Sequence, residues 1–228
     1  GVPLSYAPYG QPQLSLAPVA LGNLESVDVV RGAGSVRYGP QNVGGIINFT
    51  TRAIPKTFGG EVSVGTEIYG QGGNTKTTPS FFVGGTNASG LGLAVLYSGT
   101  HGQGWRSSND KIDLDDVLIK SHYKLNSNSS ISAALHHFEA QGQMPGGLTT
   151  AQYAADPFQS TRNYDQFTGR RTDGSLKYNY TNGRDSFEVL GYYVDSFRGS
   201  YIERDATGVN AGKRSLTGAP RDYSYYGV

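Results

Sequence analysis

Apolar and polar residues alternate with a period of two along most of the chain from about residue 60 onward. In 175–181, Leu176, Tyr178 and Tyr180 share one side, and every residue on the other side is polar. This pattern is typical of a β-strand with one apolar and one polar face. Eight strands are predicted in this way, over residues 61–69, 79–86, 91–98, 116–124, 130–137, 175–181, 187–193 and 221–228.

The links between these strands alternate between long and short without exception. The short links are 87–90, 125–128 and 181–184, and the last contains Asn182-Gly183, a pair that suits a type I′ hairpin turn. Such alternation is typical of an up-and-down barrel in an outer membrane, with tight turns on one side and extended loops outside. A soluble β-sandwich or a lipocalin-like barrel stays open as an alternative, although neither requires this difference in length. The long links are predicted over 70–78, 101–112, 140–171 and 199–220.

Residues 1–55 differ from the rest, because they form a loop-rich unit with two short predicted strands, at 24–30 and 45–50. A closed barrel of eight strands has an interior filled by its own side chains and leaves no place for this unit. A barrel of about 22 strands can hold a plug but requires far more chain than residues 56–228 supply. We therefore expect an all-β membrane protein in which residues 1–55 are the C-terminal part of a plug. Residues 56–228 are then about eight antiparallel strands of an incomplete 22-stranded transmembrane barrel.

Composition narrows the function classes. The 228 residues include 33 glycines, about twice the usual share of roughly 7%, and 16 tyrosines, which fits an all-β chain. Only 16% of the residues are charged and the net charge is +1, which argues against a nucleic-acid-binding protein and a charged disordered chain. With no cysteine, thiolate metal sites and thiol nucleophiles are excluded. The apolar runs are also far shorter than the roughly 20 residues of a membrane-spanning helix.

Two stretches near the N-terminus carry a resemblance to a known family. LESVDVVRGAGSVRYGP at 24–40 and VGGIINFTT at 43–51 resemble the end of the plug domain of TonB-dependent outer-membrane receptors. Within that family the chain is similar to the ferric citrate branch. The segments that carry this similarity are APYGQPQLSLAP at 7–18, MPGGL at 144–148, QSTR at 159–162 and GRR at 169–171.

The resemblance implies transport and no catalysis. Receptors of this branch bind an anionic ferric citrate chelate at the cell surface and import it with energy from the TonB–ExbB–ExbD complex. That complex would act through a segment that this sequence does not contain. By motif, the ligand-binding residues fall on Gln11, Gln13, Arg198 and Arg221, with ferric citrate as ligand and no cofactor, resident metal site or catalytic residue. Outer-membrane lipid and lipopolysaccharide are the other expected partners, and nucleic acid is not.

The same residues have a chemical interpretation without the family. Gln11 and Gln13 flank a proline, and alternate residues of an extended segment can present two amides to one ligand. Arg198 and Arg221 lie at the two borders of the predicted loop 199–220, and guanidinium forks suit carboxylates. A solvated loop and a rim salt bridge are the plainer alternatives. Three further arginines in the longest predicted loop could attract an anion by electrostatic steering, namely Arg162, Arg170 and Arg171.

Several other patterns are discounted. His136 and His137 are adjacent on a predicted strand, so their side chains point to opposite faces and cannot share a metal. Asp113, Asp115 and Asp116 lack the spacing of a calcium-binding loop. In the plug we expect the arginines, Arg31 and Arg37, to pair with carboxylates of the barrel wall.

Two rival functions remain open at this point. One is a receptor of the same architecture for another siderophore or carboxylate. The other is a small β-barrel outer-membrane hydrolase, which requires a nucleophile beside a base. No Ser/His/Asp arrangement in the sequence resembles such a motif.

Overall fold

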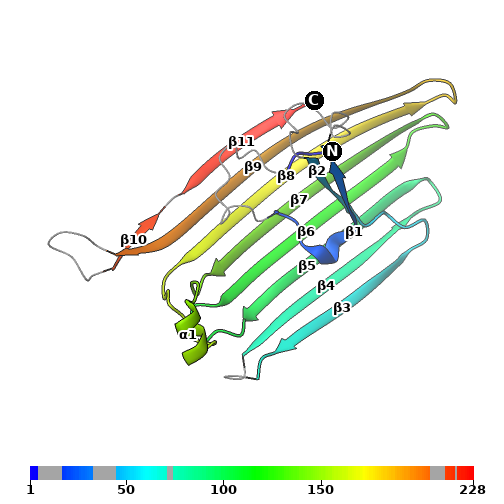
Figure 1. Ribbon diagram of the computed structural model, residues 1–228. Helices are drawn as coiled ribbons and strands as arrows, with labels where there is room; N and C mark the ends of the chain where they lie inside the picture. Colours follow the sequence, from blue (N-terminus) through cyan, green and yellow to red (C-terminus); the bar gives the residue numbers. More distant parts are fainter. Residues whose placement is uncertain (5–16, 33–44, 71–73, 206–213, 219) are drawn as a thin grey trace.

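A computed structural model of the chain describes residues 1–4, 17–32, 45–70, 74–205, 214–218 and 220–228 (Figure 1). Within these residues the chain forms a two-stranded sheet and a nine-stranded sheet. The small sheet consists of β1 (Leu24–Arg31) and β2 (Gly45–Thr51), preceded by a short 3-10 helix, η2 (Leu21–Asn23). A short helix, α1 (Thr150–Ala155), lies between two strands of the large sheet. None of the helices described is long and apolar enough to span a membrane.

The large sheet places its strands in chain order, and each pairs antiparallel with its neighbour. Figure 1 shows them as one tilted sheet with β1 and β2 in front of it. The strand β11 follows β10 along the same edge, so both pair with β9. The strands are β3 (Gly59–Ile68), β4 (Thr75–Thr86), β5 (Leu91–Gln103), β6 (Lys111–Lys124), β7 (Ser129–Gln143), β8 (Gln166–Thr181), β9 (Ser186–Asp205), β10 (Arg214–Gly218) and β11 (Arg221–Gly227).

This arrangement confirms the predicted partial barrel, and each of the eight predicted strands is present. The predicted strands were too short at the ends that meet the long links. The segment predicted as a loop over 140–171 contains the last residues of β7 and the first six of β8. The predicted loop 199–220 likewise contains the end of β9 and all of β10. The long links are therefore shorter than predicted, and several residues assigned to loops belong to the barrel wall.

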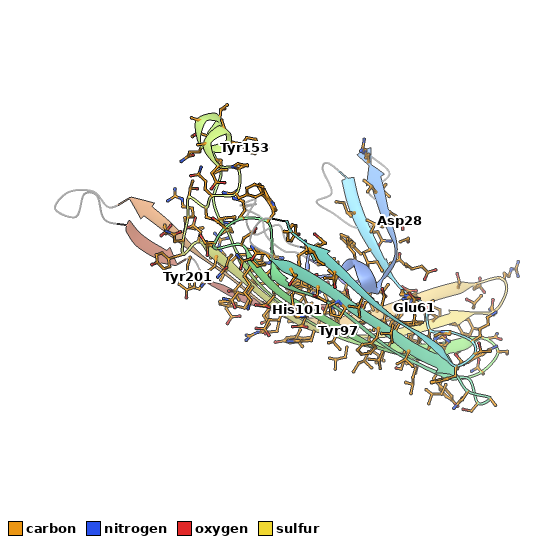
Figure 2. All side chains as sticks on the ribbon, turned by 90° about the horizontal axis from the view of Figure 1, so that it is seen from below. Asp28, Glu61, Tyr97, His101, Tyr153 and Tyr201 are labelled. Atoms are coloured by element: carbon orange, nitrogen blue, oxygen red, sulfur yellow. The ribbon has the colours of Figure 1, made fainter. Side chains whose placement is uncertain are left out.

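The two faces of the large sheet have opposite chemistry. On one face, side chains of successive strands lie exposed although they are apolar, such as Leu93, Ile119, Leu135 and Leu176. The other face carries most of the buried polar residues and packs against the N-terminal unit. Figure 2 shows β1 and β2 on the side of the sheet away from Tyr97 and His101. An apolar outer face and a polar inner face are the pattern of a transmembrane barrel wall.

The outer face also marks the height of the membrane. Near the short turns, Tyr178 and Tyr180 pack against Phe187, with ring centroids 5.7 and 5.3 Å apart. Ten residues nearer the long loops, Arg170 lies on the same face of β8, opposite Glu139 of β7. Ten residues of strand tilted by about 40° rise about 26 Å, which matches the roughly 25 Å apolar band of such barrels. The aromatic cluster of Tyr178, Tyr180 and Phe187 therefore marks one edge of the band that meets lipid. The charged row of Glu139 and Arg170 marks the other.

The N-terminal unit touches the inner face through η2. Gly22 lies so close to β5 that a Cβ at this position would come within 2.5 Å of the Ser98 hydroxyl. After β2 the chain crosses to the first barrel strand through residues 52–58, and Lys120 of β6 holds this linker. Its Nζ donates to the carbonyl of Arg52 at 2.7 Å and to the hydroxyl of Thr51 at 3.1 Å. The end of the small sheet is thus fixed to the wall.

Candidate ligand-binding site

Arg198 and Arg221 lie directly opposite each other, as register partners across the ladder between β9 and β11. Residues directly opposite in an antiparallel pair project from the same face. That face is the inner one, because Arg198 follows the buried Val194 and Ser196 at alternate positions of β9. Arg198 is 9% exposed, and Arg221 is exposed at the beginning of its strand. Two guanidinium groups therefore belong to one patch of the inner wall.

Arg198 lies differently from what the sequence predicted. It was placed at the border of a loop, but β9 continues for seven residues beyond it, to Asp205, whereas Arg221 does begin its strand, β11. The intervening residues include β10, which folds back on the end of β9, so Arg221 returns to the level of Arg198. The pairing of two long strands brings the residues together, and no sequence spacing could have set their register.

Space lies beside Arg198 on the inner wall. Its register partner on the other side is Gly169 of β8, where an added Cβ would meet none of the described atoms within 4 Å. Gly169 and Arg198 also line a cavity of about 20 Å³, together with residues that include Pro18, Phe138, Arg171 and Ser196. That volume suffices for about one water molecule. Pro18 brings the N-terminal unit against the wall next to Arg198.

The predicted amides lie outside this description. Gln11 and Gln13 fall in 5–16, which the described residues do not include. The chain on either side of them is placed, and both ends lie on the inner wall. Leu4 accepts a hydrogen bond from Arg171 at 3.0 Å, and the backbone N–H of Ala20 donates to Asp116 at 2.5 Å.

A row of buried charged residues lies next to the arginine pair. His136 of β7 places Nε2 2.9 Å from Asp116 of β6 and Nδ1 2.9 Å from Asp173 of β8. Asp173 also accepts a hydrogen bond from Nε of Arg171 at 2.6 Å. Each ring nitrogen of His136 thus faces a carboxylate oxygen, and an imidazole can donate from both nitrogens only when it is protonated. The row is a charge-assisted network inside the wall.

Sequence reasoning missed this network. Arg171 was assigned to the longest loop and to steering of an anion, but it lies in β8 and is only 1% exposed. Asp116 was considered only as part of an acidic run and His136 only as half of a histidine pair. The signal that could have found them is their shared position on the polar side of neighbouring strands.

The remaining predicted charges have other roles. Arg170 faces outward over the Phe197 ring at 6.0 Å, and Arg162 donates to the carbonyl of Glu203 at 3.2 Å. The predicted placement of all three arginines in one loop is therefore wrong, because Arg170 and Arg171 lie in β8 and face opposite sides of the sheet. Steering of an anion stays a prediction. His136 and His137 do point to opposite faces, since His137 is exposed and contacts Thr172.

The acidic run and the plug arginines also differ from a ligand site. Asp113 and Asp115 face outward beside His101, with Asp113 paired to Lys111 at 2.6 Å, whereas Asp116 faces inward. No group of three metal-binding side chains occurs among the residues described. Arg31 is exposed at the end of β1, and Arg37 falls outside the described ranges, so their pairing with the wall stays a prediction.

Comparisons with known proteins agree with this architecture. Residues 1–46 match the family model of the TonB-dependent Receptor Plug Domain. The crystal structure of the ferric citrate transporter FecA in its unliganded form is 45% identical, with a TM-score of 0.86 over 99% of this chain. The siderophore receptor PirA from Acinetobacter baumannii is 14% identical with a TM-score of 0.63 over 90% of the chain, a likeness of fold alone. The chain covers 33% of the first structure and 31% of the second.

Proposed function

Because the chain belongs to the TonB-dependent receptors of the outer membrane, and spans about a third of the solved receptors it matches, we propose a transport function for the whole protein. The receptor binds an anionic ferric citrate chelate at the cell surface and imports it into the periplasm. The proteins it resembles are a transporter and a receptor, so the hydrolase interpretation is set aside.

The observation that carries the choice of ligand is the pairing of Arg198 with Arg221. Two guanidinium groups that are register partners place positive charge together on one patch of the inner wall, which suits an anionic ligand. A citrate chelate of iron presents several carboxylate oxygens, and guanidinium groups bind carboxylates with two parallel hydrogen bonds. Gly169 adds no side chain beside Arg198, and none of the described atoms lies within 4 Å of where its Cβ would be. The 45% identity to a ferric citrate transporter supports the same choice.

Gln11 and Gln13 complete the proposed site from the plug side. Their amides can donate to carboxylate oxygens without adding charge. The flanking residues favour this role, because Leu4 and Ala20 are bonded to the wall and Pro18 lines the cavity at Arg198. The segment that carries both glutamines thus begins and ends at the inner wall.

Import requires the plug to move so that the ligand can pass through the barrel. We assign residues 1–55 to the plug and 56–228 to the barrel, since β2 ends at Thr51 and the barrel sheet begins at Gly59. The TonB–ExbB–ExbD complex supplies the energy for this movement. Lipid and lipopolysaccharide surround the outer face.

The test is a titration of the full-length receptor. We expect saturable binding of ferric citrate and much weaker binding of a ferric hydroxamate, which is not a polycarboxylate. An absence of ferric citrate binding would contradict the proposed ligand. Preference for another chelate would identify a receptor of the same architecture with a different cargo.

A further inference from the structure

Two separate stretches of the plug are hydrogen-bonded to the inner face of the barrel wall, at the row of buried charged residues described above. The first is residues 3–4 and the second is residues 20–23, and the segment that contains Gln11 and Gln13 joins them. We call these two stretches the stems of that segment. Their hydrogen bonds to the wall come from three strands, β6, β8 and β11.

The first stem is held through its carbonyl groups. Nη1 of Arg171 donates to the carbonyl of Leu4 at 3.0 Å and to the hydroxyl of Tyr225 at 2.9 Å. The hydroxyl of Tyr225 donates in turn to the carbonyl of Pro3 at 2.7 Å. Two neighbouring carbonyls of the stem are therefore satisfied by side chains of β8 and β11.

The second stem is held by one residue of β6. Oδ2 of Asp116 accepts from the backbone N–H of Ala20 at 2.5 Å, and its carbonyl accepts from the side-chain amide of Asn23 at 3.1 Å. Asp116 and Asn23 are each only 1% exposed. Both contacts are thus sheltered from water, where a hydrogen bond is electrostatically stronger, and the one to the carboxylate is also charge-assisted.

His136 joins the two anchors. It lies between Asp116 and Asp173, and Asp173 is bonded to Arg171, so a continuous chain of hydrogen bonds runs from Ala20 to Leu4. Buried networks of this kind fix the positions of their members because a misplaced member leaves another one unsatisfied.

We propose that Asp116, Arg171 and Tyr225 are positioning residues that hold both stems of the glutamine-bearing segment beside the Arg198–Arg221 pair. On the inner wall the network lies next to that pair. Arg171 is two residues from Gly169 on β8, and Gly169 is the register partner of Arg198. The role rests on the proposed function, because its value is to present Gln11 and Gln13 to the chelate. The network is also a set of contacts that the plug must break when it moves.

Three variants of the full-length receptor test this role. Tyr225→Phe removes one hydroxyl and keeps the ring, and Arg171→Met removes the guanidinium and keeps much of the apolar stem. Arg170→Met is the matched control, because Arg170 is the next residue of the same strand and faces outward. Barrel assembly of each variant is checked first, because an assembled barrel resists unfolding by detergent until the sample is heated.

Hydrogen exchange of the plug peptides is then measured together with ferric citrate affinity. We expect Arg171→Met and Tyr225→Phe to speed exchange in the peptides of the stems, with no change in β1 and β2. Affinity should fall about tenfold, as for the loss of one hydrogen bond to a charged group. Arg170→Met should change neither measurement.

Two outcomes would overturn the role. Unchanged exchange in the stems would show that the network does not hold them, and faster exchange with unchanged affinity would show that it does not position the site. Failure of the unmodified receptor to bind ferric citrate would instead defeat the proposed ligand. The positioning role would fall with it, whereas the exchange data would still decide whether the stems are anchored.

Discussion

Arg198 of β9 and Arg221 of β11 are register partners on the inner face of the barrel wall, 23 positions apart in the sequence. No regular helix or tight hairpin brings two residues at this separation together. They come together because β9 extends beyond Arg198, the chain folds back through β10, and β11 then pairs with β9. The result is a concentration of positive charge on a wall whose neighbouring positions are small, such as Gly169 and Ser196.

The first prediction concerns these two arginines. Replacing either with methionine should weaken ferric citrate binding by about ten- to a hundredfold, because a hydrogen bond to a charged group contributes about 1.5–3 kcal/mol. The double variant should abolish measurable binding. The measurement is equilibrium titration of the purified full-length receptor with ferric citrate.

Lys177→Met is the control for this prediction. Lys177 also faces inward on β8, but it lies nearer the short turns and pairs with Glu188 at 3.2 Å. Its loss should leave affinity unchanged. Unaltered binding by the double arginine variant would remove both residues from the site.

The second prediction concerns the space at Gly169. A Cβ at position 169 meets no described atom within 4 Å, and Gly169 is not among the glycines with positive φ. The barrel of a Gly169→Leu variant should therefore assemble normally. The side chain would occupy the room beside Arg198, and we expect at least a tenfold loss of ferric citrate affinity with both arginines intact. Gly191→Leu is matched, because a Cβ at Gly191 also meets none of the described atoms within 4 Å but lies on the outer face. Equal affinities for the two variants would show that the ligand does not use this space.

Much of the fold could be predicted from the sequence because lipid imposes a simple pattern. Leu176, Tyr178 and Tyr180 alternate with polar residues, since one face meets the membrane and the other the plug. The pattern stops where strands rise beyond the apolar band. Around Glu139 and Arg170 the outer face becomes polar, while the inner positions Phe138 and Ala140 of β7 are apolar, so the pattern of an apolar outer face ends and the strand ends were predicted as loops. Strand continuity there is set by backbone pairing with neighbours.

The site was less accessible to sequence reasoning. The pairing of Arg198 with Arg221 depends on strand register, and the network of Asp116, His136 and Arg171 depends on contacts between strands and with the plug. Each of these residues looks like an ordinary polar residue of an alternating strand. Their distinction comes from burial beneath the plug, which only the assembled structure supplies.

The third prediction concerns the lipid-facing band. Leu135→Arg places a charge on the outer face between the aromatic cluster and the charged row, where arginine costs about 2–4 kcal/mol in a barrel of this kind. Gln141→Arg is matched, because Gln141 lies on the same face of β7 beyond Glu139. We expect a lower free energy of unfolding in lipid vesicles for Leu135→Arg and little change for Gln141→Arg. Similar values for the two would mean that the band has been placed at the wrong height.

The fourth prediction concerns the linker between plug and barrel. Lys120→Met removes the two hydrogen bonds to Thr51 and Arg52 and leaves the Arg52 carbonyl without this donor, at a cost of about 1–3 kcal/mol. Hydrogen exchange should quicken in the peptide over residues 49–58, while the barrel strands keep their protection. Lys124→Met is matched, since Lys124 lies four residues further along the same face of β6 and is exposed. If both variants leave exchange in 49–58 unchanged, the linker is held by the pairing of its flanking strands and Lys120 only covers it.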